Sequence, residues 1–310
     1  MQTRVFRPKM RSSFMFTGLS AFPLTPLRDG VVDETAFAGL IENLSSAKVD
    51  SIGVLGSTGS YAYLNREERR LATRLAVSVA GEVPVIVGIG SVATRDVLLL
   101  ADDAQAAGAC ALLLPPVSYQ KLGADEVFEF YETLAHHVSV PLVVYDNPGT
   151  THFEFTDELH GRIAALPNVA SIKIPSMNLD PAQASARVAR LRASIPGHVS
   201  IGISGDAFAV TGLNAGCELW YSVLGGLFPR TALALIEATE GAHSGRAVEL
   251  SAGLEPLWAM FREYGSVRVI AAAAEIMGQA AANCLPLPLK GLDRQSKERL
   301  VQMLKALELA

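Results

Sequence analysis

The sequence predicts an α/β protein, a (β/α)8 TIM barrel with a C-terminal helical extension. Short apolar runs alternate with amphipathic stretches, and most of the runs end about 30 residues apart, the length of one strand plus one helix. The runs are continuously apolar, as in VPVIVGIG and VPLVVY, which is typical of parallel strands buried on both faces. Eight such units favour a closed barrel, and an open doubly wound sheet is the alternative.

Each strand is expected where an apolar run ends. The runs end near Ala21, Val54, Gly88, Leu114, Tyr145, Lys173, Ser204 and Ser222. The last interval is only 18 residues long, which predicts a shortened helix before the eighth strand.

Helix start and stop signals lie between the runs. Asn65 and Glu68 form a capping-box pattern, in which each side chain accepts a hydrogen bond from the other residue's backbone N–H. Further start signals are Thr94, Thr156 and Asp180, the last followed by a proline. Glycines that can end a helix in the left-handed conformation are Gly81, Gly108 and Gly216.

Helical periodicity takes over after the eighth strand. We expect the eighth barrel helix first, and then helices over 246–264, 267–277 and 297–307. A proline-rich linker at 285–289 precedes the last of them.

The first 15 residues are expected to form a flexible arm outside the barrel. They are basic, contain no acidic residue and lack the apolar core of a secretory signal. A transit-like leader and a misassigned start are the alternatives. The predicted organisation is therefore an arm at 1–15, a barrel at 16–240 and a helical appendage at 241–310.

Composition excludes several function classes. The hydrophobic share is 50% and the charged share 18%, which excludes disorder. A net charge of −5 argues against nucleic-acid binding. No apolar run is long enough to span a membrane. Three distant cysteines and scattered histidines indicate neither a disulfide framework nor a metal site, so we expect a cytoplasmic protein without a metal.

Lys173 is the most informative single residue. It stands inside the apolar run of the sixth strand, and lysine is almost never buried without a partner or a function. Strand alternation places Val169, Ser171 and Lys173 on one face, so we expect Lys173 to point into the barrel mouth. Burial lowers the pKa of an amine, and a neutral amine can attack a carbonyl to form a Schiff base. A buried ion pair is the structural alternative.

Two other strand ends complete the candidate site. Tyr145 and Lys173 end consecutive strands, and adjacent parallel strands are about 4.8 Å apart, so a phenol and an amine can converge. Gly56, Ser57, Thr58 and Gly59 follow the second strand, where backbone N–H groups and hydroxyls can hold a carboxylate. The Lys173 amine, the Tyr145 phenol and the carboxylate-binding turn together predict a site for a small-molecule 2-oxo acid. The turn would hold the carboxylate, and Lys173 would react with the ketone.

A glycine pattern after the third strand offers a different function. Gly88, Gly90 and Ala93 form G-x-G-x-x-A between a strand and a helix, a near match to the dinucleotide fingerprint. No acidic residue ends the following strand, and the pattern is third in order instead of first. An NAD-dependent dehydrogenase is therefore the weaker hypothesis.

The motifs together resemble those of the dihydrodipicolinate synthase / N-acetylneuraminate lyase family of class I aldolases. The matching pieces are GSTG at 56–59, YDNP at 145–148, IK at 172–173 and SGD at 204–206. The resemblance runs from about residue 16 to the C-terminal helices. It implies the barrel fold, a pyruvate-type imine on Lys173, Tyr145 as acid/base and carboxylate binding by Ser57 and Thr58.

The resemblance also implies properties beyond the isolated chain. Tyr119 stands 26 residues before Tyr145, where family members place a tyrosine that a neighbouring subunit donates to a proton relay with Ser57. The family assembles as homotetramers, dimers of dimers, and uses no organic cofactor.

Departures from the family pattern concern the acceptor half of the site. Family members that condense pyruvate with aspartate semialdehyde carry an arginine where this chain has Thr150, and a hydroxyl cannot make the bidentate pair that a guanidinium makes with a carboxylate. Tyr221 and Trp220 are bulky at the eighth strand. Thr150, Gly205 and Tyr221 are therefore candidates for contacting the second substrate. An aromatic acceptor could use Trp220, Tyr221 or Phe208, and a sugar acid could use Thr150, Thr151, His152 and Ser204.

Four functions follow from these observations. The first is a Schiff-base lyase or aldolase acting on pyruvate or another 2-oxo acid with an unknown acceptor aldehyde. The others are an authentic 4-hydroxy-tetrahydrodipicolinate synthase, a sugar-acid dehydratase using the same imine, and a catalytically silent 2-oxo-acid-binding barrel.

Overall fold

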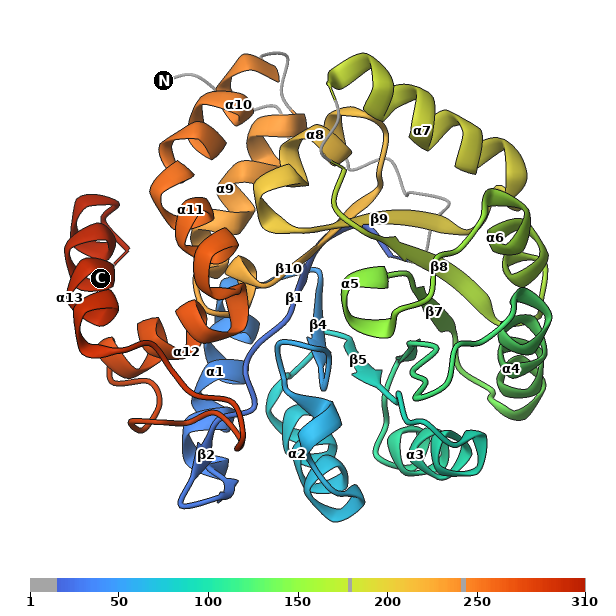
Figure 1. Cartoon of the computed structure of the whole chain (residues 1–310), viewed down its shortest axis with the longest axis horizontal. Helices are drawn as coiled ribbons and strands as arrows, with labels where there is room; N and C mark the ends of the chain where they lie inside the picture. The colour runs from blue at the N-terminus through green and yellow to red at the C-terminus, as the bar shows by residue number, and fades with distance from the viewer. Residues whose placement is uncertain (1–15, 178–179, 241–243, 310) are drawn as a thin grey trace, which may run out of the picture.

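The computed structural model describes residues 16–177, 180–240 and 244–309 of the 310-residue chain. In this part of the chain, eight parallel strands close into a barrel with helices arranged around them (Figure 1). Strand β1 pairs with both β4 and β10, and this double pairing closes the ring. The predicted (β/α)8 barrel is confirmed, and the doubly wound sheet is wrong. The predicted arm at 1–15 lies outside the described residues.

Every predicted strand is present. The barrel strands are β1 (Gly18–Ala21), β4 (Ser51–Val54), β5 (Val85–Gly88), β6 (Ala111–Leu114), β7 (Leu142–Tyr145), β8 (Val169–Ile174), β9 (Ser200–Ser204) and β10 (Leu219–Ser222). All end at the predicted residue except β8, which continues by one residue. A small antiparallel hairpin, β2 (Leu27–Arg28) and β3 (Val31–Val32), follows β1 and was not predicted.

The helices alternate with the strands as expected. Those of the barrel are α1 (Glu34–Ala47), α2 (Arg66–Val79), α3 (Thr94–Ala106), α4 (Ala124–His137), α5 (Pro148–Thr151), α6 (Asp157–Ala164), α7 (Pro181–Ser194), α8 (Ala209–Asn214) and α9 (Pro229–Glu240). Short 3-10 helices are η1 (Tyr61–Tyr63), η2 (Asp206–Phe208) and η3 (Leu224–Gly226). The 6-residue α8 is the shortened helix that the last interval predicted.

The capping signals explain where several helices begin. Asn65 and Glu68 form the reciprocal capping box of α2. Thr156 and Asp180 each accept a backbone N–H as the N-cap of α6 and α7. The expectation at Thr94 is off by one residue, because Ala93 is the N-cap of α3 and makes no side-chain cap.

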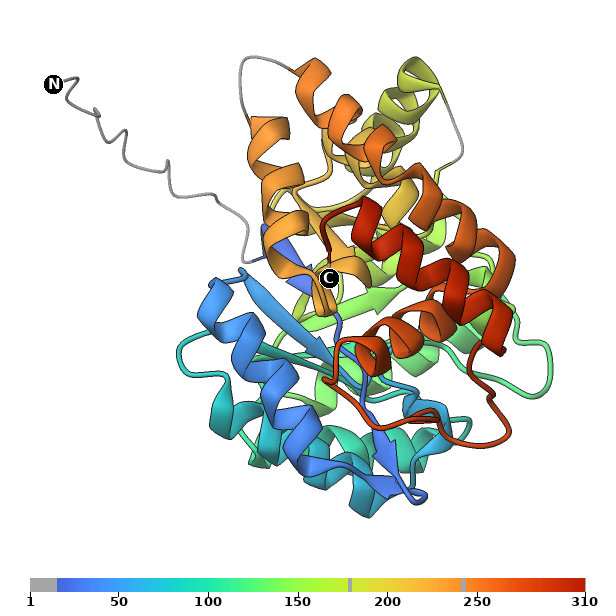
Figure 2. The ribbon, with the colours of Figure 1, turned by 90° about the vertical axis from the view of Figure 1, so that its left-hand side faces the viewer.

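The C-terminal helices continue the outer layer of the barrel. They are α10 (Ser244–Gly253), α11 (Glu255–Tyr264), α12 (Ser266–Ile276) and α13 (Arg294–Ala306), and Figure 2 shows them stacked in orange and red. The single helix expected over 246–264 is wrong, because the chain breaks at Leu254, before a proline in the first turn of α11. Helix α10 packs on α8 and α9, while α11 contacts η2 at the carboxyl end of β9.

Two apolar clusters form the core. The larger one lies between the strands and the helices, and the smaller one fills the barrel interior with strand side chains, Phe16 and Phe22. A register shift between β7 and β8 puts Val169 in the outer cluster and Ala170 in the inner one, which reverses the predicted facing of these two residues. From Ser171 onward the predicted alternation is correct. None of the helices in the described ranges has the length and apolar character needed to cross a membrane.

Candidate active site

Lys173 lies in the barrel mouth near the carboxyl end of β8. Its Cα is in register with Tyr145 on β7 and with Gly202 on β9. The side chain is only 8% exposed, and its Nζ lies 4.1 Å from the ring centroid of Phe22, 4.9 Å from that of Tyr145 and 5.4 Å from that of Tyr221. Three aromatic rings therefore surround the amine, and the predicted approach of Tyr145 to Lys173 is confirmed.

Phe22 is a site residue that sequence reasoning missed. Its ring fits because Gly53 and Gly56 have no side chains: a Cβ on Gly53 would lie 2.3 Å from the ring, and one on Gly56 would lie 2.7 Å from it. The sequence signal that was available is a pair of glycines, Gly53 and Gly56, on either side of the predicted strand end at Val54, where missing side chains leave room for a ring. Gly56, the first glycine of the GSTG turn, therefore makes room for the Phe22 ring beside Lys173.

The environment of Lys173 favours the neutral amine. Burial lowers the pKa of Lys173 from 10.5 to about 7, and the negative charge of Asp206 opposes this shift. No carboxylate of the described residues forms an ion pair with the Lys173 Nζ, which excludes a direct ion pair there. At neutral pH an appreciable fraction of the amine is therefore unprotonated.

Asp206 belongs to a buried network behind the lysine. Its Oδ1 accepts hydrogen bonds from Trp220 Nε1 at 3.0 Å and Ser222 Oγ at 2.9 Å, and its Oδ2 accepts one from the Leu224 N–H at 3.1 Å. Burial nevertheless raises the pKa of Asp206 from 3.8 to about 6. The network ties the end of β9 to the end of β10.

The Tyr145 hydroxyl has two hydrogen-bond partners. It lies 2.8 Å from Ser57 Oγ, and Asn147 Nδ2 donates to it at 3.0 Å. Ser57 follows β4 and Tyr145 ends β7, so the bond crosses the barrel mouth. The structure thus brings together Lys173, Tyr145 and Ser57, as the sequence predicted.

The turn after β4 exposes hydrogen-bond donors. The backbone N–H groups of Ser57 and Thr58 have no acceptor among the described residues. Leu55 adopts a φ of 55°, and Gly59 packs closely, since a Cβ there would lie 3.0 Å from the Leu55 nitrogen. This strained turn can hold an anion through its free N–H groups.

A cavity of about 370 Å³ opens above Ser57. It is lined by Ser57, Ser60, Tyr61, Ala62, Tyr63, Val117, Thr150, Val267, Arg268 and Leu289. Helix α12 and the segment before α13 therefore form one part of the wall, and η1, α5 and the loops after β4 and β6 form the rest. Thr150 lies in this wall, and its Oγ1 donates to the Asn147 carbonyl at 3.3 Å.

The remaining predicted site residues lie in different positions. Tyr119 is 89% exposed, and it is not among the residues that line the cavity above Ser57. Gly205 has a φ of 86° at the start of η2. The Tyr221 ring faces Lys173, but its hydroxyl is 2.8 Å from Ser171 Oγ and is not available to a substrate. Trp220 is wrong as an acceptor contact, because its ring is fully buried in the outer cluster.

Packing explains Gly88, which ends β5, and Gly90, which follows it. A Cβ on Gly88 would lie 1.9 Å from the Leu55 carbonyl oxygen, and one on Gly90 would lie 2.4 Å from the Pro115 ring. The buried Arg69 guanidinium donates to the carbonyls of both glycines at 2.9 Å. The G-x-G-x-x-A pattern therefore does not form a dinucleotide turn.

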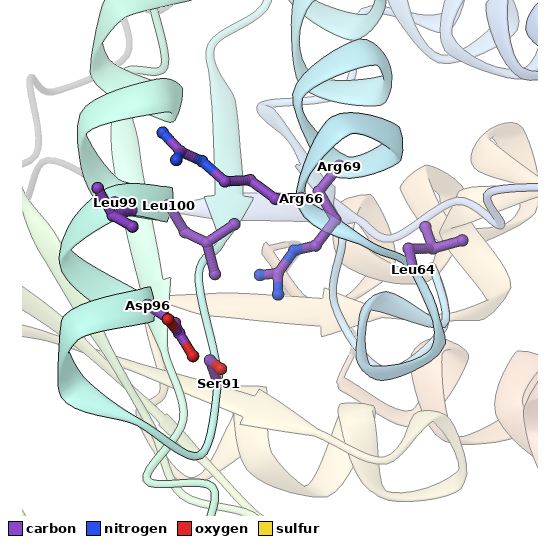
Figure 3. A pocket seen from close by; sticks show the side chains of 7 residues that line it. All are labelled: Leu64, Arg66, Arg69, Ser91, Asp96, Leu99 and Leu100. Atoms are coloured by element: carbon purple, nitrogen blue, oxygen red, sulfur yellow. The ribbon is translucent and has the colours of Figure 1, made fainter.

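Arg69 also faces a second, smaller cavity of about 200 Å³ between α2 and α3 (Figure 3). Arg66 lines it too and is paired with Asp103 at 2.6 Å. This cavity contains none of the predicted site residues. In the described ranges, no three histidine, cysteine or acidic side chains are grouped to hold a metal ion.

Comparison with known proteins places the chain in a family. The model of the dihydrodipicolinate synthetase family matches residues 15–307. A 4-hydroxy-tetrahydrodipicolinate synthase of Oleidesulfovibrio alaskensis is 32% identical over 290 residues, covering 92% of this chain and 96% of that protein.

Solved structures agree in fold. A dihydrodipicolinate synthase from Agrobacterium tumefaciens has a TM-score of 0.90 and 44% identity, covering 94% of this chain and 98% of that one. A dihydrodipicolinate synthase variant described as monomeric has a TM-score of 0.87 and 26% identity, covering 96% of this chain and 99% of that one.

Proposed function

The chain belongs to the dihydrodipicolinate synthetase family, and from this premise we propose that it binds pyruvate or a related 2-oxo acid as an imine on Lys173. Members of the family are class I aldolases and lyases, so the protein is an enzyme of that class. The single observation that supports the choice of residue is a buried lysine in register with a tyrosine at the barrel mouth.

The first step is attack of the neutral Lys173 amine on the ketone carbon. The carbinolamine that results loses water to give the imine, and loss of a proton from the adjacent carbon gives an enamine. A pKa of about 7 supplies the neutral amine near physiological pH. The enamine carbon then attacks an aldehyde, and hydrolysis of the product imine regenerates Lys173.

Tyr145 is the proposed proton carrier. Its hydroxyl can give a proton to the departing water and take one back through Ser57, which lies 2.8 Å away. Asn147 donates to the same oxygen and so fixes its position. Tyr145 and Ser57 therefore form a relay from the amine toward the cavity.

The substrate carboxylate is assigned to the turn after β4. The free N–H groups of Ser57 and Thr58 are suited to an anion, and Gly56 and Gly59 allow the turn to form. Holding the carboxylate there would direct the ketone toward Lys173.

The acceptor aldehyde and the oligomeric state rest on fewer observations than the imine on Lys173. Relatives are named 4-hydroxy-tetrahydrodipicolinate synthase, but the arginine expected of that activity is replaced by Thr150. We therefore favour an aldolase or lyase with a different acceptor over an authentic synthase. A homotetramer, in which Tyr119 of one subunit reaches the relay of another, and a cytoplasmic location remain proposals.

Intact mass and peptide mapping after treatment with pyruvate and borohydride test the proposal. We expect a reduced adduct on Lys173. Absence of any adduct with pyruvate and longer 2-oxo acids, in folded protein, would favour the silent binding barrel.

A further inference from the structure

Arg268 is the positively charged residue in the wall of the cavity above Ser57. It stands in the first turn of α12, and the cavity lining contains no aspartate or glutamate. Ser57 lines the same cavity and is bonded to Tyr145, so whatever occupies the cavity lies next to the proposed relay.

Some N–H groups of the Arg268 guanidinium have no hydrogen-bond acceptor among the described residues. Its Nε donates to the Lys290 carbonyl at 3.2 Å and its Nη1 to the Tyr264 carbonyl at 3.5 Å. In the part of the chain that the structure describes, Nη2 has no acceptor and no carboxylate pairs with the side chain. Two backbone carbonyls thus hold the exposed group in place, and its charge is available to an anionic ligand.

The rest of the lining suits a small organic molecule. Val117, Val267 and Leu289 supply apolar surface, and Thr150 supplies a hydroxyl. A volume of about 370 Å³ accommodates a molecule of a few carbons. A neutral aldehyde would use the apolar wall and leave the guanidinium without a partner.

We infer that Arg268 is a specificity-determining residue that selects acceptor aldehydes carrying a carboxylate remote from the reacting carbonyl. This inference rests on the proposed imine chemistry. A guanidinium forms strong, charge-assisted hydrogen bonds with a carboxylate, which fixes the orientation of the acceptor. Helix α12 therefore contributes to substrate choice from outside the barrel.

The test measures acceptor preference in matched variants. Condensation with pyruvate is followed for succinate semialdehyde and for butyraldehyde, which has the same chain length without the carboxylate. Arg268→Met removes the charge, Arg268→Lys retains it, and Arg294→Met removes an equal charge from the start of α13. Pyruvate adduct formation is measured in every variant, so a failure of the imine chemistry is distinguished from a failure of acceptor selection.

We expect wild-type protein to prefer the carboxylated aldehyde in kcat/KM. The preference should fall about 10- to 100-fold in Arg268→Met and less in Arg268→Lys, and Arg294→Met should keep it. If the wild-type protein forms the adduct but shows no preference for the carboxylated aldehyde, or turns over neither aldehyde, Arg268 does not select the acceptor. An equal loss with both aldehydes in Arg268→Met and Arg268→Lys would also overturn the inference.

Discussion

Tyr145 and Lys173 are register partners on the neighbouring strands β7 and β8, and the Lys173 Nζ lies 4.9 Å from the Tyr145 ring centroid. The pairing holds an amine and a phenol together on two rigid strands, without support from a flexible loop. The Tyr145 hydroxyl then reaches across the mouth to Ser57. Because strands position these groups, substitutions should change chemistry without moving the site.

The rate of adduct formation should depend on pH with a midpoint near 7. Only the neutral amine attacks the ketone, and burial lowers the pKa of Lys173 to about 7. Trapping by cyanoborohydride, followed by intact mass between pH 5.5 and 9, should show a rate that rises and then levels off. A rate that keeps rising to pH 9 would indicate an ordinary lysine.

Lys173→Met should abolish the adduct and stabilise the fold, most strongly at low pH. The folded-state pKa of Lys173 is about 7 and the unfolded value 10.5, so the unfolded chain binds more protons between these values. The cost of burying Lys173 is therefore complete below pH 7 and declines as the pH rises toward 10.5. The stability gained by the variant should be about 2–3 kcal/mol larger at pH 6 than at pH 9.

Urea unfolding at the two pH values measures this difference. Lys305→Met, which changes an exposed lysine on α13, is the matched control and should show no comparable pH dependence. A gain that is equal at pH 6 and pH 9 would contradict a lowered pKa of Lys173.

Tyr145→Phe should reduce turnover about 100- to 10,000-fold, the usual contribution of a positioned proton donor. The ring beside Lys173 is retained, while the hydroxyl that contacts Ser57 and Asn147 is lost. Steady-state kinetics with whichever acceptor is active measures the effect. Tyr221→Phe is the comparison, because its hydroxyl faces Ser171, and it should lose less than tenfold. Similar losses in both variants would remove Tyr145 from the relay.

Tyr119→Phe tests whether a second subunit completes the site. Tyr119 is 89% exposed, so an effect on turnover requires that another copy of the chain carries it to Tyr145. Native mass spectrometry should find a dimer or tetramer, and the variant should be slower by tenfold or more. Tyr264→Phe, which removes a hydroxyl that contacts Ser296 on α13, is the control. A fully active monomer would exclude a shared site.

The fold could be predicted from local sequence signals. Each signal determines the start or the type of one element within a few residues, and the order of the elements then indicates the barrel. The capping pair Asn65 and Glu68 determines where α2 begins, and continuous apolar runs identify parallel strands. The helix break at Leu254 and the facing of Val169 and Ala170 were missed. The break had a local signal, the proline in the first turn of α11, which the helical periodicity on both sides of it obscured. The facing of Val169 and Ala170 depends on the register shift between β7 and β8, which periodicity along one strand does not record.

The reacting residues of the candidate site were predictable from the sequence, and the residues that surround them were not. Lys173, Tyr145 and Ser57 were found because chemistry-bearing side chains at strand ends must converge in a barrel. Phe22 was not found, although Gly53 and Gly56 leave room for its ring. Arg268 was not found, because a surface arginine carries no signal until the structure places it in the cavity wall.

Closure of the ring by β1 and β10 has a consequence for the newly synthesised chain. Lys173 leaves the ribosome before residues 219–222, the strand to which β1 must pair. Without residues 219–222 the chain lacks Tyr221, one of the three rings around the amine, and Ser222, whose carbonyl accepts the Phe22 N–H. The burial that lowers the pKa of Lys173 is therefore complete only in a chain that includes its last barrel strand.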